Sequence, residues 1–97
     1  MLRHVVLMRW KEGTSDAQKR AVREGLAALP AAIPEIRSYR FGDDAALAEG
    51  NFDFAVVADF DDATDFQTYA SHDAHQKLIT EHIRPILRDR VAVQYAL

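Results

Sequence analysis

The chain has 97 residues, of which 12 are lysine or arginine and 15 are aspartate or glutamate, so its formal net charge is −3. A mildly acidic chain has no broad electrostatic attraction for phosphate backbones or anionic lipids, which excludes nucleic acids and membrane surfaces as expected partners. The sequence contains no cysteine, and this excludes disulfides, thiol nucleophiles and cysteine-ligated metals.

The length fits a single domain over residues 1–97. Hydrophobic residues make up 48% of the chain, although a domain of this size buries only about two-thirds of the surface that its unfolded chain exposes. This surplus indicates an oligomer. No apolar stretch approaches the ~20 residues of a membrane span, and no targeting segment is visible before the first predicted strand, so we expect a cytoplasmic protein.

Residues 3–11 predict a first strand, because they are rich in valine, leucine and methionine. Successive side chains of a strand point to opposite faces of its sheet. One face carries Leu2, His4, Val6, Met8 and Trp10, and the other carries Arg3, Val5, Leu7, Arg9 and Lys11. Because both faces hold apolar residues, we expect this strand to be covered on both sides.

A helix is predicted to begin near Asp16, because Ser15 and Gln18 form the signature of a capping box. Apolar residues then recur at helical spacing. Pro30 and Pro34 mark the end of this helix, since proline has no N–H group to donate to a continuing helix.

Two strands are predicted over residues 36–42 and 52–60, joined by a polar connection. Apolar residues alternate strictly along the second of these strands, and Ala55 and Val57 make its opposite face partly apolar as well. Both of its faces are therefore expected to be covered.

A short helix over residues 63–71 and a longer one over residues 73–87 are predicted next, and Pro85 should kink or end the longer helix. The inner stripe of the longer helix is expected to contain Ala74, His75, Leu78, Ile79, His82 and Ile83. Residues 90–97 are predicted to close the chain as a last strand.

The predicted order is β-α-β-β-α-β, which is the split βαβ arrangement of an α+β, ferredoxin-like sandwich with a four-stranded antiparallel sheet. Helices cover one face of such a sheet. The other face is expected to carry Val5, Leu7, Ala55 and Val57, and it is too apolar to face water. The same face of a second chain is its simplest cover, which predicts a two-fold homodimer.

His4 is the most conspicuous polar residue, because it interrupts an apolar strand face. It is interpreted either as a core histidine with a hydrogen-bond partner or as part of a site. His75 is expected in the first turn of its helix, where the helix N-terminus disfavours an imidazolium. A neutral imidazole there is suited to act as a general base, with the Tyr69 hydroxyl as a hydrogen-bond donor to a substrate oxygen. The alternative is that His72 and His75 only cap or pack.

A metal site is not expected. His72 and His75 are neighbours on a helix surface, but zinc needs three or four converging ligands. His82 lies about 10 Å further along the helix axis than His75, and Asp73 points away from His75. Phe66 is interpreted as a core residue, and residues 59–62 are interpreted as a solvated strand end followed by a helix start.

Five segments of the chain resemble the stress-responsive dimeric α/β barrel (Dabb) family. They are His4–Leu7, Ile33–Ile36, Ser38–Gly42, Phe52–Val57 and Tyr69–His75. Asp73 stands where the family usually has proline in its His-Pro-Ala-His motif, and aspartate is well tolerated at a first helical position. The resemblance extends over essentially the whole chain.

The resemblance implies a ferredoxin-like homodimer whose paired sheets form a barrel with the helices outside. It also implies a pocket between sheet and helices, as in the family's plant polyketide cyclase, with His4, Tyr69 and His75 as catalytic residues. His75 would remove a proton α to a carbonyl group, Tyr69 would hold the carbonyl oxygen, and His4 would assist without any cofactor. The pocket is expected to be lined by Val6, Met8, Trp10, Leu26, Phe66 and Leu78.

The leading hypothesis is therefore a homodimer that binds a small apolar, aromatic or keto molecule in this pocket. Whether it also turns that molecule over is left open, and cyclase-like lyase or aldol chemistry without a cofactor is the reaction expected if it does. The alternatives are a non-catalytic, stress-associated structural dimer, which needs no cavity beneath His4, and a cofactor-free enzyme resembling the dimeric monooxygenases that share this architecture.

Overall fold

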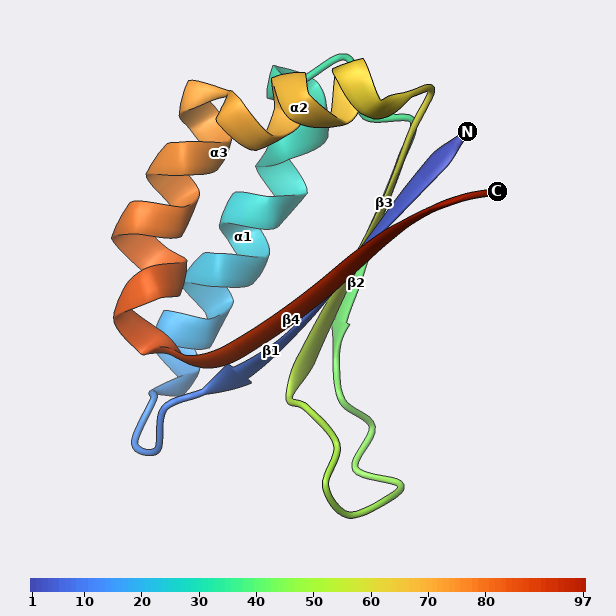
Figure 1. The fold of residues 1–97 in the computed structure, drawn as a ribbon. Coiled ribbons are helices and arrows are strands. Elements are labelled where there is room, and N and C mark those ends of the chain that lie inside the picture. The colour runs from blue at the N-terminus through green and yellow to red at the C-terminus, as the bar shows by residue number, and fades with distance from the viewer.

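Strands and helices follow one another in the predicted order in the computed structural model, which describes all of residues 1–97 (Figure 1). The elements are β1 (Leu2–Trp10), α1 (Asp16–Ala32), β2 (Ser38–Asp43), β3 (Phe54–Phe60), α2 (Ala63–Ser71), α3 (Asp73–Leu78), the π-helical turn η1 (Ile79–Ile83), the 3₁₀ turn η2 (Arg84–Ile86) and β4 (Leu87–Ala96). No helix is both long and apolar enough to cross a membrane.

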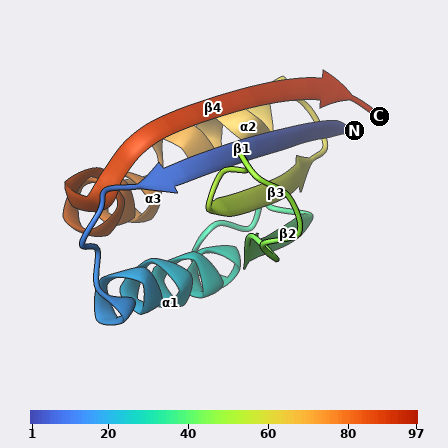
Figure 2. The same ribbon diagram turned by 90° about the horizontal axis from the view of Figure 1, so that it is seen from below.

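The four strands form one antiparallel sheet in the order β2-β3-β1-β4, so β1 is a central strand and β4 is an edge strand. All helices lie on one face of this sheet, and the other face has no cover within the chain (Figures 1 and 2). This arrangement confirms the predicted ferredoxin-like fold.

The first helix begins as its capping box predicts. The Ser15 side chain accepts a hydrogen bond from the Gln18 backbone N–H at 3.1 Å, and the Gln18 side chain accepts one from the Ser15 N–H at 2.9 Å. Two of the N–H groups that have no partner within the helix are satisfied in this way. The helix ends at Ala32, between Pro30 and Pro34.

The longer second helix was predicted incorrectly in its last part. Regular α-helix ends at Leu78, and the chain continues through a π-helical turn and a 3₁₀ turn into β4, which begins at Leu87. A π-helical turn contains an additional residue, so side chains within and after it point in different directions from those of a regular helix. His82 is therefore exposed instead of belonging to the inner stripe, whereas Ile83 is buried.

The third strand begins at Phe54, two residues later than predicted. Asp53 precedes the strand and forms hydrogen bonds to the end of β1. Its backbone N–H donates to the Met8 carbonyl at 2.9 Å, and its carboxylate accepts a hydrogen bond from the Trp10 N–H at 2.8 Å. A side chain thus replaces the strand partner of Trp10 at this end of β1.

The helix-side face of the sheet forms the core. Buried residues from β1 and β3 pack there against Val22, Leu26 and Leu29 of α1. The opposite face remains apolar and accessible along β1 and β4, where Leu7, Val91, Val93 and Tyr95 are exposed and Val93 retains 53% of its accessible surface.

One ion pair lies on this open face, and it corrects the interpretation of Asp59 as solvated, whereas Asp61 and Asp62 are exposed directly before α2, as expected. Asp59 is only 8% exposed, and it accepts two hydrogen bonds from the Arg3 guanidinium at 2.8 and 2.9 Å. These charge-assisted bonds hold the pKa of Asp59 below its usual range. Bidentate arginine–carboxylate pairs are both strong and directional, so the pair stabilises the pairing of β1 with β3.

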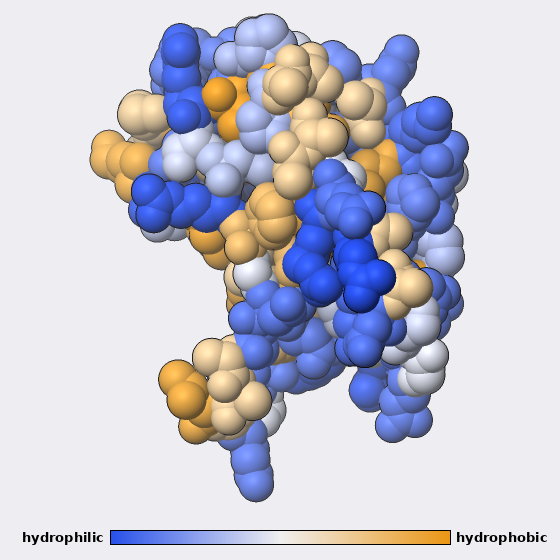
Figure 3. Space-filling model, turned by 180° about the vertical axis from the view of Figure 1, so that it is seen from behind, coloured by the Kyte–Doolittle hydropathy of each residue, from blue (hydrophilic) through white to orange (hydrophobic).

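The loop between β2 and β3 projects from the body of the molecule, and its tip is apolar (Figures 1 and 3). Leu47 at this tip is 88% exposed, and Ala46 has a positive φ of 59°. The Asp44 carboxylate orders the loop, because it accepts hydrogen bonds from the Ala46 N–H and from the Asn51 side chain.

Gly25 permits the close approach of α1 and α3, since an added Cβ at this position would overlap Cδ1 of Leu78. Alanine has a helix propensity about 1 kcal/mol better than glycine, but overpacking of a core costs about 1–3 kcal/mol. We expect the net of these two effects to lower the free energy of unfolding of Gly25→Ala by about 1 kcal/mol, measured by urea denaturation. The same substitution in a Leu78→Ala background should be much less destabilising. A more stable Gly25→Ala variant would contradict this account of the helix contact.

Candidate functional site

A cavity of about 300 Å³ lies between the helix-side face of the sheet and the helical layer formed by α1, α2, α3 and η1. Most of its lining is hydrophobic. Its polar or charged lining side chains are His4, Tyr39, Tyr69, His75, Arg84 and Arg90. An apolar cavity with a few convergent polar groups is the usual form of a small-molecule site.

The structure brings most of the predicted site residues into this cavity. His4, Tyr69, His75, Val6, Met8, Leu26 and Phe66 all line it. Trp10 and Leu78 do not. Trp10 lies at the far end of β1, with its ring 5.7 Å from that of Phe54, and Leu78 faces Gly25 of α1.

His4 projects from the first part of β1 into the helix-side layer and is 4% exposed. Its Nδ1 atom accepts a hydrogen bond from the Gln94 side-chain amide, 2.8 Å away on β4. Because Nδ1 is the acceptor, neutral His4 carries its proton on Nε2. Burial lowers the pKa of His4 to about 4, and the charges of Arg90 and His75 add to this effect. His4 is therefore neutral at pH 7 and presents an N–H donor.

His75 has the opposite arrangement. Its Nδ1 atom lies 3.1 Å from the Ala70 carbonyl oxygen, which only accepts hydrogen bonds, so Nδ1 carries the proton. The Nε2 atom of neutral His75 then has a free lone pair. Burial lowers the pKa of His75, although the Ala70 hydrogen bond partly offsets this shift. At Nε2, neutral His75 is thus a hydrogen-bond acceptor, whereas neutral His4 is a donor.

Two tyrosines complete the polar group. The Tyr69 and Tyr39 hydroxyl oxygens are 2.7 Å apart, and the Tyr69 ring stacks obliquely on the His75 ring with centroids 4.2 Å apart. Burial raises the pKa of both tyrosines, so both hydroxyls are protonated at pH 7. One of the two hydroxyl protons lies between the two oxygens. The other hydroxyl proton is free to form a hydrogen bond to a ligand oxygen.

Sequence reasoning did not identify Tyr39, Gln94 or Arg90 as parts of this site. Tyr39 lies on β2 and the other two on β4, and each faces the helical layer because of its register with the neighbouring strand. Alternation along each strand is the only sequence signal that could have placed them. His72 has the capping role that was weighed for it, since its Nδ1 atom accepts from the Ala74 N–H at 3.1 Å.

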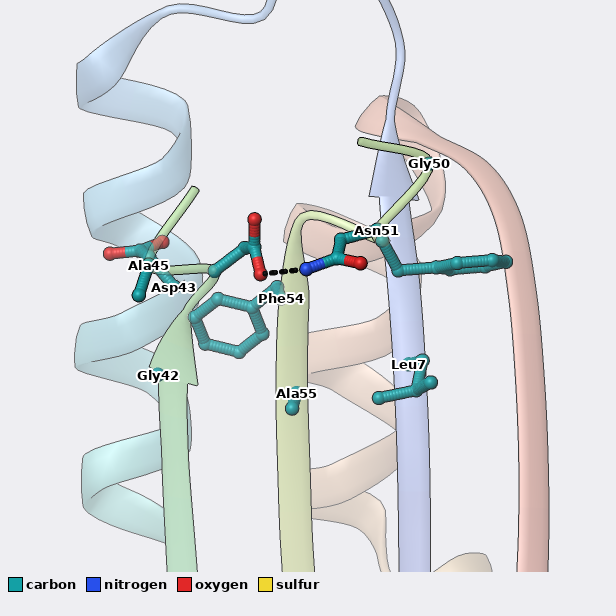
Figure 4. Close-up of a pocket in the computed structure, with 10 residues that line it drawn as sticks. Leu7, Gly42, Asp43, Ala45, Gly50, Asn51, Phe54 and Ala55 are labelled. Carbon is teal, nitrogen blue, oxygen red and sulfur yellow. Dashed lines mark hydrogen bonds between the residues drawn. The ribbon is translucent and has the colours of Figure 1, made fainter. Parts of the chain in front are cut away.

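A second, wider hollow of about 540 Å³ lies on the opposite side of the sheet. It is formed by Leu7 of β1, Ala55 of β3 and the β2–β3 loop, which the Asn51–Asp44 hydrogen bond holds in shape (Figure 4). No histidine or tyrosine lines it. The hollow adjoins the apolar face that has no cover within the chain, since Leu7 belongs to both. Nowhere in the chain do three or more histidine, aspartate or glutamate side chains group to hold a metal.

The sequence matches the family model of the Stress responsive A/B Barrel Domain, Dabb, over residues 2–97. The chain belongs to the Dabb family. This match confirms the family resemblance, and comparison with curated proteins gave no match.

Solved structures of Dabb-like proteins superpose on nearly all of the chain. A dimeric ferredoxin-like protein of unknown function from Thermobifida fusca is 48% identical, with 99% of this chain and 90% of that chain covered and a TM-score of 0.91. A dimeric protein of unknown function from Bacteroides fragilis is 25% identical, with 99% and 95% covered and a TM-score of 0.86. Hydroxynitrile lyase from Passiflora edulis is 21% identical, with 97% and 90% covered and a TM-score of 0.85, and shares the fold.

The lowered pKa of His4 predicts a specific pH dependence of stability. A histidine with a pKa near 6.5 when unfolded and about 4 when folded is protonated first in the unfolded chain as the pH falls. The stability associated with neutral His4 is complete above pH 6.5 and is lost towards pH 4. Between pH 7.5 and pH 5 the free energy of unfolding should fall by about 2 kcal/mol from this group.

Urea denaturation at fixed protein concentration measures this slope. His4→Gln should make this slope shallower, and the remainder comes in part from buried His75, whose pKa is also lowered. His82→Gln, which changes an exposed histidine, should leave the slope unchanged. An identical slope in wild type and His4→Gln would show that His4 titrates normally in the folded protein.

Proposed function

We propose that this Dabb protein is a homodimer that binds a small aromatic or keto compound in the His4–Tyr69–His75 cavity and activates it by cofactor-free acid–base chemistry. The observation that carries the proposal is the pair of neutral histidines with opposite proton placement. His4 offers Nε2–H, and His75 offers a free Nε2 lone pair, in one mostly apolar cavity. The reaction class is the lyase or aldol chemistry of polyketide cyclases.

His75 acts as the base in this proposal. Its unprotonated Nε2 removes a proton α to a substrate carbonyl, and the electrons move onto the carbonyl oxygen to form an enolate. The Tyr69 hydroxyl, positioned by its hydrogen bond with Tyr39, donates to that oxygen and stabilises the developing charge. The enolate carbon then attacks a second carbonyl of the same molecule. The His75 imidazolium returns its proton to the new alkoxide and becomes neutral again, while His4 assists as a hydrogen-bond donor through Nε2–H.

The apolar lining supports this chemistry, because excluding water strengthens the hydrogen bonds to the enolate oxygen. The same cavity weighs against a purely structural dimer, which would need no space beneath His4. A cavity of about 300 Å³ is at the lower end of the range for small-molecule sites, which favours compounds with one or two rings.

Homodimerisation is proposed through the open face of the sheet. Leu7, Val91, Val93 and Tyr95 are exposed there side by side on β1 and β4, and an apolar face of this kind is stable only when covered. The protein from Thermobifida fusca that shares 48% of its sequence with this chain is described as dimeric, which supports the same assembly here.

His75→Ala tests the acid–base proposal. A panel of aromatic and β-keto compounds is screened for turnover with the wild type, with His75→Ala and with His82→Ala as the matched control on the exposed side of the same helical segment. Loss of a general base should lower kcat about 100-fold or more, while His82→Ala keeps wild-type activity. Equal binding and turnover in all three proteins would rule out the site, and oxygen uptake during turnover would indicate monooxygenase chemistry instead.

Val93→Lys tests the proposed interface. Burying a charge without a partner is strongly unfavourable, so this variant should be monomeric at micromolar concentration, as measured by light scattering. Ala27→Lys places the same charge on the exposed side of α1 and should remain dimeric. A monomeric wild type, or a dimeric Val93→Lys variant, would contradict the interface.

A further inference from the structure

The cavity has charge of only one sign. Arg84 and Arg90 are its only charged lining residues, and no aspartate or glutamate lines it. They are also its only exposed lining residues, since every other one is buried or half-buried. The two arginines therefore mark the opening of the cavity to solvent, while the neutral histidines and tyrosines lie inside.

The fold places these two side chains at the same opening. Arg90 is paired with Met8 in the sheet register, and Gln94 is paired with His4, so Arg90 lies on the helix-side face of the edge strand β4. Arg84 belongs to the 3₁₀ turn that leads into the same strand. Leu87, which lies between them in sequence, also lines the cavity.

Neither arginine side chain forms an ion pair or a hydrogen bond within the chain. The five ion pairs of the chain use Arg3, Arg9, Arg23, Arg37 and Arg88. Arg84 and Arg90 take part in none of them, and neither side chain donates a hydrogen bond within the chain. The charge of Arg90 nevertheless extends into the cavity, because it contributes to lowering the pKa of both His4 and His75.

We propose that the ligand of this cavity is a carboxylate, with its acid group held by Arg84 and Arg90 at the opening and its apolar or aromatic body inside. This inference rests on the proposed small-molecule function of the same cavity and specifies the substrate class. Guanidinium groups recognise carboxylates through paired N–H donors. The orientation would place the carbonyl or ring carbon nearest the acid group beside the histidines and tyrosines.

Inward-pointing charges on an edge strand also prevent sheets from pairing edge to edge. That role would account for Arg90 without any ligand, and it predicts that binding is indifferent to the charge of the ligand. The two explanations are distinguished by a pair of probes with the same shape and different charge.

Naphthoate and its neutral amide, naphthamide, are such a pair, and their binding is measured by calorimetry. Wild type should bind naphthoate about 10-fold more tightly than naphthamide, since hydrogen bonds to charged groups are the stronger ones. Arg84→Gln and Arg90→Gln should each weaken naphthoate binding several-fold, and the double variant should remove the preference. Naphthamide binding should be nearly unchanged in all three. Added salt should weaken only naphthoate binding, because the arginines are exposed.

Arg88→Gln is the matched control, because Arg88 is on the same strand, pairs with Asp89 and does not line the cavity. It should bind both probes as the wild type does. Equal affinity of the wild type for the two probes would overturn the carboxylate inference and leave the cavity proposal intact. An equal loss in Arg88→Gln would also overturn it. Failure of both probes to bind at millimolar concentration would contradict the inference and the proposed function together.

Discussion

The need to cover an apolar sheet on both faces is the constraint on which this structure depends. The chain has helices for one face only (Figure 2), so the other must find its cover outside the chain. The central strand β1 serves both sides, because consecutive residues point in opposite directions. His4 faces the cavity and Val5 faces the open side. The proposed binding site and the proposed interface thus lie on opposite faces of the same sheet.

The chemistry of the cavity follows from burial combined with fixed hydrogen-bond partners. Burial favours uncharged histidines, and the partner of each ring then decides which nitrogen carries the proton. The Gln94 amide donates to Nδ1 of His4 and so places the His4 proton on Nε2, whereas the Ala70 carbonyl accepts from Nδ1 of His75 and leaves Nε2 unprotonated. Neither assignment needs a ligand, so the donor and the acceptor are set before anything binds. Such preorganisation is the main source of electrostatic catalysis in enzyme sites.

Sequence reasoning identified the fold because strict alternation and the capping box are local signals, and the structure follows both. It also brought His4, Tyr69 and His75 together through the family resemblance. It missed Tyr39 and Gln94 because their partners lie 30 and 90 residues away, and only strand register reveals such pairs. His82 was misplaced because a π-helical turn has no clear sequence signature. Trp10 shares a strand face with pocket residues but lies at the far end of β1, and Leu78 faces Gly25 of α1 instead of the cavity.

The position of Trp10 gives the protein a built-in optical probe. It is the only tryptophan, its indole is buried beside Phe54, and its Nε1 atom has no hydrogen-bond partner. Its fluorescence emission should therefore shift to longer wavelength when the core opens to water, so this one signal reports unfolding of the core.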